Sequence, residues 1–448
     1  MEHGLRRTLT LYPLVLFGLA YMAPMIVFGT FGVMDQTTHG SAVTAYIIAS
    51  VAMLFTAYSY GRMAKAYPIS GSAYTYVRRT MGSHLGFVIG WVTLLDYFFL
   101  PMVIWLIGGV YLNAVLPGVP TWIWIVLFIV VTTIINVVGI RVSTNVNLLL
   151  MMFQFLVIAI FLALSIRDVA HGMGAGRLLS AQPFVNPHVQ FGFIMAGASI
   201  ACYSFLGFDA VTTMTEETIR PEPTVPRAIM LIVLIGGVIF IAATYFTQLV
   251  YPDYTKFANA DAGAVEIARQ IGGNLFTAVF TAGLIIAQLS SGISAQASAA
   301  RLLYAMGRDK VLPRRFFGRI HARFRTPDLN ILLVGLFGLL ALFFSVETST
   351  SFINFGAFTA FAFVNLAVIV HYFVQQRLRG GWGAILYGLL PLIGFGFDAW
   401  LWLNLDRNAM ILGAIWLVVG LIYLTVLTRG FRVAPPEMRL DDWTAMDG

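Results

Sequence analysis

The chain has 448 residues and a formal net charge of +7, and 59% of its residues are apolar while only 10% are charged. A soluble globular domain carries about 25% charged residues, so this composition excludes a protein that faces water on all sides. The positive charge does not indicate a nucleic-acid partner, because the lysines and arginines flank long apolar segments instead of gathering in one basic stretch.

The apolar segments predict an all-α polytopic membrane protein, because about 20 apolar residues suffice to cross about 30 Å of hydrocarbon as a helix. We expect twelve transmembrane helices, at 11–34, 43–66, 84–113, 122–140, 145–166, 191–216, 226–250, 275–305, 329–346, 351–376, 383–403 and 410–428. The first segment is long and has no small-residue cleavage site, so it is interpreted as the first span and not as a signal peptide. The whole of 1–428 is expected to be one transporter domain, followed by a short tail at 429–448.

The basic residues divide unequally between the two ends of these spans. If both termini are cytoplasmic, 22 of the 27 lysines and arginines lie inside and five lie outside. Such an excess on the cytoplasmic side is typical of membrane proteins, and one missed or extra span would destroy it. We therefore expect cytoplasmic termini, two larger outer loops at 167–190 and 251–273, and a basic inner loop at 306–328 with a short helix on the membrane surface.

Two spans contain signs of a broken helix. The first has Pro24 at mid-depth, and the sixth has Gly207 followed by Asp209. Proline removes a backbone hydrogen bond and disfavours helix just before itself, although such residues can also merely kink a membrane helix. The two breaks lie five spans apart, and paired interruptions of this kind are typical of transporters built from inverted repeats. We predict a first repeat at 11–166, an inverted second repeat at 191–376 and two accessory spans at 383–428.

Two carboxylates lie at mid-depth in these spans, where ionisable groups are expensive and tend to be functional. Asp96 lies about 17 Å into the third span at 1.5 Å per residue, and Asp209 follows the break in the sixth span. No lysine or arginine occupies mid-depth in any predicted span. The pair predicts an electronegative cavity for a cationic substrate, a proton or both. The alternative is a protonated carboxyl group in a packed core, or a cap on a broken helix.

Other polar residues are weaker candidates. Glu216 and Glu217 end the sixth span, where they are either solvated or form a gate contact with Arg227. His371 could relay protons or simply pack. The coupling-ion candidates in the eighth span are Ser290, Ser291 and Ser294, although small residues there also allow close helix packing.

The aromatic side chains of Tyr21, Phe205 and Phe208 could stack on an ammonium group. Asp398 lies in the eleventh span and is expected to have a peripheral role. Cys202 is the only cysteine, which excludes an internal disulfide, and the seven histidines lack metal-ligand spacing. No metal, cofactor or catalytic constellation is expected, so the chain is not predicted to be an enzyme.

Three motifs resemble the amino acid–polyamine–organocation (APC) transporter superfamily. They are Tyr67–Tyr76 between the second and third spans, Glu216–Thr218 followed by Pro226–Ile229, and Arg301–Pro313 after the eighth span. The segments Gly18–Met25, Leu94–Tyr97 and Phe205–Asp209 are more similar to bacterial putrescine importers within that superfamily.

The resemblance implies a five-plus-five inverted-repeat (LeuT-type) core in a bacterial cytoplasmic membrane, with discontinuous spans 1 and 6 and alternating access. It also implies a substrate site between spans 1, 3, 6, 8 and 10. The candidate substrate-binding residues are Tyr21, Met22, Ala23, Pro24, Asp96, Tyr97, Phe205, Gly207, Phe208 and Asp209.

Two departures from the superfamily pattern are informative. Amino-acid carriers typically bind the substrate carboxylate at a glycine-rich break in span 1, whereas here the break contains Pro24, which has no N–H. Some proton-coupled relatives use a lysine in span 5, whereas this span has only Gln154. The first departure favours a substrate without a carboxylate, and the second leaves Asp96, Asp209 and His371 as candidate proton carriers.

The leading prediction is a secondary transporter that imports putrescine or a related diamine, driven by the proton gradient and surrounded by membrane lipid. An amino-acid permease or a diamine/amino-acid exchanger of the same fold is the alternative. A membrane sensor would need an effector domain and a channel would need a filter motif, and neither is visible. The sequence makes no prediction of oligomeric state.

Overall fold

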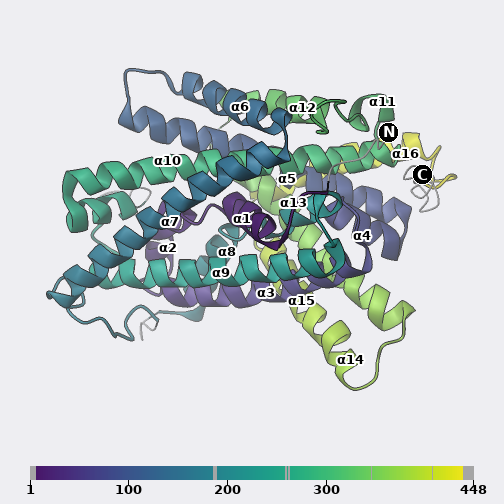
Figure 1. Ribbon diagram of the computed structural model, residues 1–448. Helices are drawn as coiled ribbons and strands as arrows, with labels where there is room; N and C mark the ends of the chain where they lie inside the picture. Colours follow the sequence, from purple (N-terminus) through teal and green to yellow (C-terminus); the bar gives the residue numbers. More distant parts are fainter. Residues whose placement is uncertain are drawn as a thin grey trace.

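The computed structural model describes residues 7–184, 189–257, 260, 263–344, 346–405 and 407–436, and its elements are helices (Figure 1). Arg6 and residues 437–448 of the predicted tail lie outside the described residues. Figure 1 shows the axes of the long helices α3, α9 and α10 lying roughly parallel to one another through the molecule.

The helices of the predicted first repeat and its loops are α1 Leu11–Met22, α2 Ile26–Thr37, α3 Ala42–Ala66, α4 Ser72–Met81, α5 Ser83–Val115, α6 Thr121–Val138 and α7 Ile140–Ala170. Those of the second are α8 Phe191–Tyr203, the 3₁₀ helix η1 Phe208–Glu217, α9 Pro221–Val250, α10 Gly263–Arg308, α11 Arg314–Phe317, α12 Asp328–Gly338, the 3₁₀ helix η3 Leu339–Leu342, α13 Val346–Val368 and the π-helical η4 Ile369–Gln375. The accessory part holds α14 Trp382–Ala384, the π-helical η5 Ile385–Leu389, α15 Leu390–Leu403 and α16 Arg407–Leu427.

The helix lengths show a multi-pass membrane protein, as the composition predicts. Ten described helices are long and apolar enough to cross a membrane. The pair α1 and α2 passes the same test together, with a bend of 43° at its break, and Asp328–Leu342 is a shorter apolar helix. The all-α class is therefore confirmed, while the count of twelve spans stays a prediction.

Some boundaries differ from the sequence-based ones. Helix α9 begins at Pro221, five residues earlier than predicted, because proline is well suited to the first turn, where its missing N–H has no helical partner. Helix α7 begins at Ile140, directly after Gly139 at φ 135°. Helix α4 was not predicted, since its Arg78 and Arg79 give it the appearance of a loop. Helix α10 is interrupted at Gly273 (φ 65°), near the predicted start of the eighth span.

The end of α1 meets the turn between α8 and η1. Helix α1 ends where Ala23 turns to φ 51°, and α8 ends at Tyr203, followed by Gly207 at φ 102°. A Cβ atom on Gly207 would collide with the ring of Tyr21. Glycine is therefore required at position 207 for two reasons: the backbone is left-handed there, and Tyr21 approaches too closely for a side chain.

We expect Gly207→Ala to destabilise the protein by at least about 1–2 kcal/mol, because a left-handed backbone disfavours any Cβ and the methyl group also displaces Tyr21. Thermal unfolding of the purified protein in detergent measures this change. Gly192→Ala is the matched control: Gly192 lies in α8 with no atom near its would-be Cβ, so that variant should unfold at the parental temperature or slightly above it. Equal unfolding temperatures for the two variants would contradict the close packing at Gly207.

Candidate functional site

Asp96 and Asp209 lie near each other in the interior. Asp96 comes from α5 and Asp209 from the first turn of η1, and their side chains are close enough for their charges to interact. Both residues are almost fully buried, at 3% and 1% exposed. Neither forms an ion pair with a lysine or arginine among the described residues. Two carboxylates are thus held together without a cation.

The hydrogen bonds of Asp209 leave one of its oxygens free. Its Oδ2 accepts from the Tyr97 hydroxyl at 2.9 Å and from the Ser72 hydroxyl at 3.3 Å. Its Oδ1, and likewise Oδ1 of Asp96, has no hydrogen-bond partner among the described residues. A buried carboxylate oxygen without a partner costs free energy, so a ligand that donates hydrogen bonds there gains correspondingly.

The break after α1 contributes a backbone acceptor and an aromatic wall. The Ser291 hydroxyl of α10 donates to the carbonyl oxygen of Tyr21 at 2.5 Å. The phenol of Tyr21 lies within electrostatic range of Asp96 and Asp209. From the opposite side, Gly356 of α13 packs directly on the backbone of Asp96. Elements from predicted spans 1, 3, 6, 8 and 10 therefore converge around the two carboxylates.

The remaining predicted substrate residues do not all face the carboxylates. Phe208 packs on Tyr60, with ring centroids 5.7 Å apart, and Tyr60 is itself within electrostatic range of both aspartates. Met22 instead lies against Gly236 of α9. Phe205 also turns towards α9, where its ring meets that of Phe240 at 5.1 Å. Ala23 and Pro24 are buried within the break.

The serines of α10 have protein partners. Ser290 donates to Asn147 Oδ1 at 3.2 Å, and Asn147 Nδ2 donates to Ser294 at 2.7 Å, so both serines join α10 to α7. Ser291 binds the end of α1 as described above. Their suggested role as ion ligands stays a prediction, and close packing between helices accounts for what the structure shows of them.

The acidic end of η1 forms ion pairs that differ from the expected one. Glu217 makes a two-point ion pair with Arg301, and Glu216 pairs with Arg308. A gate contact with Arg227 was one expectation for these glutamates, but in the described structure they pair with Arg301 and Arg308 of α10. The reason is that α10 runs alongside η1 at this end, whereas Arg227 lies in an exposed position on α9.

This network joins all three signature motifs. Ser70 donates its N–H to Glu216 at 3.2 Å and its hydroxyl to the Thr213 carbonyl at 2.9 Å. Tyr74 donates to Asp309 at 2.9 Å. The first described residues also join, since the N–H groups of Thr8 and Leu9 donate to the Glu217 carbonyl. The polar network lies at the end of η1, seven to eight residues beyond Asp209 in the chain.

His371 and Asp398 lie apart from this site. His371 Nδ1 is 3.0 Å from the Tyr67 hydroxyl, and the histidine sits in η4 at the end of its span. Asp398 is fully buried and accepts from Thr56 at 3.0 Å and Asn365 at 2.8 Å, which ties α15 to α3 and α13. Asp398 thus links helices away from the carboxylate site, and its peripheral role in transport stays a prediction.

Three residues of interest were missed from the sequence. Ser72 and Asn147 carry no motif that shows which partners they reach, and only the packing reveals them. Asp35 in α2 is fully buried, and neither carboxylate oxygen has a hydrogen-bond partner in the described part of the chain. It lies one residue beyond the predicted end of the first span at 11–34, so it was not counted among the carboxylates at mid-depth.

Comparison with known proteins identifies the family. The amino acid permease family matches residues 14–405. The chain belongs to the amino acid permease family. The permease is 43% identical over 434 residues to the low-affinity putrescine importer PlaP of Escherichia coli (strain K12), covering 97% of this chain and 96% of that protein. The resemblance to the APC superfamily is thereby confirmed.

More distant relatives are named for other substrates, namely branched-chain and cationic amino acids. The permease is 25% identical over 449 residues to the branched-chain amino acid permease BcaP of Bacillus subtilis (strain 168), covering 96% of this chain and 94% of that protein. It is 27% identical over 402 residues to cationic amino acid transporter 4 of Mus musculus, covering 83% of this chain and 60% of that protein.

Breaking one partner of the Glu217–Arg301 pair should strongly destabilise the permease. Glu217→Ala and Arg301→Ala should each cost about 3–5 kcal/mol, because each leaves the other charge buried and unpaired. The double variant should lose much less than the sum of the two. Thermal unfolding in detergent tests this, with the exposed Glu222→Ala as control. Strictly additive losses would show that the two side chains act independently.

Proposed function

We propose that this permease imports putrescine or a related diamine across a bacterial cytoplasmic membrane, by alternating access coupled to the proton gradient. The observation that carries the proposal is the pair of buried carboxylates, Asp96 and Asp209, each with an oxygen that has no hydrogen-bond partner among the described residues. A substrate with two ammonium groups supplies two charge-assisted donors to such a site.

The break in the first span supports a substrate without a carboxylate. Pro24 has no N–H, and the bulky Met22 and Met25 flank it, packing against Gly236 of α9 and Gly283 of α10. The carbonyl end of α1 points its negative dipole end at the site, which favours a cation. The 43% identity to a protein named as a putrescine importer agrees with this preference.

The architecture proposed for this activity has twelve spans with both termini in the cytoplasm. It comprises the ten long helices, the bent pair α1 and α2 as one discontinuous span, and Asp328–Leu342 as the shortest span. Spans 1–5 and 6–10 form the two inverted repeats, and α15 and α16 belong to the accessory spans. The unequal distribution of basic residues supports the orientation.

Alternating access follows from the burial of the site. Asp96 and Asp209 are at most 3% exposed, so a substrate reaches them only if helices move. The network of Glu216, Glu217, Arg301 and Arg308 closes the proposed cytoplasmic end. We assign the inner gate to these ion pairs, and their separation would open a path from Asp209 to the cytoplasm.

A proton is assigned to one of the two aspartates. Two like charges close together in a low-dielectric interior repel each other strongly, so an empty carrier is more stable with one carboxyl group protonated. The ammonium group of the substrate binds the carboxylate that stays ionised, so the proton and the substrate occupy the carrier together and cross the membrane in the same direction. His371 is less suited to this task because its span end lies apart from the carboxylates.

An amino-acid substrate is the alternative to a diamine, supported by the permeases of lower identity.

The substrate prediction is that diamines compete with labelled putrescine while leucine does not. Uptake is measured in proteoliposomes with an imposed proton gradient, with and without a protonophore, and with sodium replaced by choline. Putrescine and cadaverine should inhibit, lysine should inhibit weakly because its carboxylate finds no donors, and the protonophore should abolish accumulation. Equal competition by leucine and cadaverine would overturn the diamine assignment, and strict sodium dependence would overturn the proton assignment.

The site prediction concerns Asp96→Asn and Asp209→Asn. A charge-assisted hydrogen bond contributes roughly 1.5–3 kcal/mol, so loss of the ammonium partner should weaken putrescine binding by about ten- to a hundredfold. A proton carrier behaves differently: its Asn variant should exchange substrate yet lose gradient-driven accumulation. Binding, exchange and net uptake are measured for both variants. Two variants that bind and accumulate like the parent would refute the site.

A further inference from the structure

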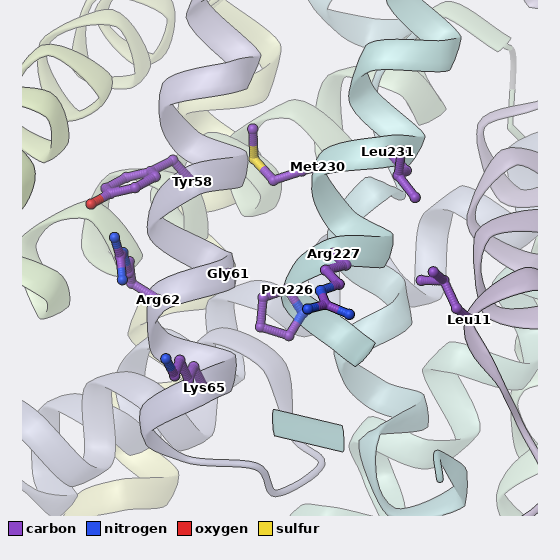
Figure 2. Close-up of a pocket in the computed structure, with 9 residues that line it drawn as sticks. All are labelled: Leu11, Tyr58, Gly61, Arg62, Lys65, Pro226, Arg227, Met230 and Leu231. Atoms are coloured by element: carbon purple, nitrogen blue, oxygen red, sulfur yellow. The ribbon is translucent and has the colours of Figure 1, made fainter. Parts of the chain in front are cut away.

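A groove of about 530 Å³ opens between α3, α9 and the start of α1, away from the carboxylate site (Figure 2). Figure 2 shows Tyr58, Gly61, Arg62 and Lys65 along α3, Pro226, Arg227, Met230 and Leu231 along α9, and Leu11 on α1. The backbone of α3 approaches α9 closely at Gly61, whose would-be Cβ lies 3.5 Å from the ring of Pro226. Gly61 and Pro226 both line the groove at this contact.

The groove is apolar where it runs along the helices. Leu11, Met230 and Leu231 line it, and Leu231 is 38% exposed. An apolar groove on the outside of a membrane-spanning bundle meets lipid chains and not water. Its shape and lining therefore suit an acyl chain.

The groove is basic at one end. Arg62, Lys65 and Arg227 line it, and none of them forms an ion pair with a carboxylate in the described structure. The Arg62 guanidinium instead lies over two aromatic rings, 5.0 Å from the centroid of Tyr58 and 5.4 Å from that of Tyr387. Three cations are thus gathered at one groove, and no carboxylate of the described residues forms an ion pair with them.

The position of these cations matches a membrane surface. Lys65 is the penultimate residue of α3, and Arg227 lies about 9 Å from the start of α9 at 1.5 Å per residue. The two helices run antiparallel, so their basic residues share one end of the bundle, the end where Glu217 and Arg301 also pair. Basic pockets between membrane helices at this depth are suited to the head groups of anionic lipids.

We propose that this groove binds one anionic phospholipid, with its phosphate held by Arg62, Lys65 and Arg227 and one acyl chain lying along Leu11, Met230 and Leu231. The charge of the groove excludes the cationic substrate as its occupant. The lipid bridges α3, α9 and α1, and so contacts the helices that flank the broken first span. This proposal rests on the multi-pass topology and not on the proposed substrate.

The test uses the purified full-length permease and native mass spectrometry with phosphatidylglycerol and phosphatidylcholine of identical acyl chains. The parent should retain phosphatidylglycerol at least about tenfold better than phosphatidylcholine. The triple variant Arg62→Gln/Lys65→Gln/Arg227→Gln should lose most of this preference, since each cation near an anionic lipid contributes a few-fold. Met230→Trp fills the groove and should reduce retention of both lipids.

The matched control removes three exposed cations outside the groove at the same end, as Lys310→Gln/Arg314→Gln/Arg315→Gln. This control makes the same change in net charge as the groove variant but leaves the groove intact. It should therefore keep the parental preference for phosphatidylglycerol. If the triple groove variant does not fold, Arg227→Gln alone, at an exposed position, should still lower the preference a few-fold. A parent without preference for phosphatidylglycerol, or equal losses in the groove and control variants, would overturn the proposal.

Discussion

The buried ion pair between Glu217 and Arg301 is the contact on which the rest of this structure depends. It fixes the end of η1 to α10, and η1 in turn carries Asp209. Removing a carboxylate and a guanidinium from water costs free energy. The pair is stable only because Arg301 binds Glu217 in a bidentate geometry and also donates to the Ala297 carbonyl. The same requirement suits the pair to the proposed inner gate. Once the carboxylate and the guanidinium separate, both need water, and water reaches them only when this end of the bundle opens.

A second constraint acts at the two helix breaks. Tyr21 and Gly207 touch, so the end of α1 and the turn before η1 are held together as one unit. The backbone of this unit supplies the Tyr21 carbonyl that Ser291 binds, and its side chains supply a phenol and the Asp209 carboxylate. Polar backbone away from a regular helix is tolerable at membrane depth only where protein or a cavity covers it. The burial of this unit meets that condition.

The two aspartates form the site that we propose for a cation. Tyr97 and Ser72 hold one oxygen of Asp209 in place, while its other oxygen and one of Asp96 remain without partners in the described structure. The groove at Arg62, Lys65 and Arg227 has the opposite sign and lies on the outside. The carboxylate site and the groove thus carry opposite charges, and they lie in different parts of the molecule.

The sequence by itself determined the all-helical multi-pass class, the positions of most helices, and the placement of Asp96 and Asp209 in membrane-length apolar segments, because hydrophobicity over about 20 residues depends on local composition alone. It also singled out Pro24 and Gly207, since their backbone preferences are local. Only the tertiary structure decided that Arg301 and Arg308, and not Arg227, pair with the glutamates, that Asn147 joins two serines of α10, and that Met22 and Phe205 turn towards α9. Those outcomes depend on which helix faces meet, and contacts between residues 84 or 143 positions apart leave no trace in a local pattern.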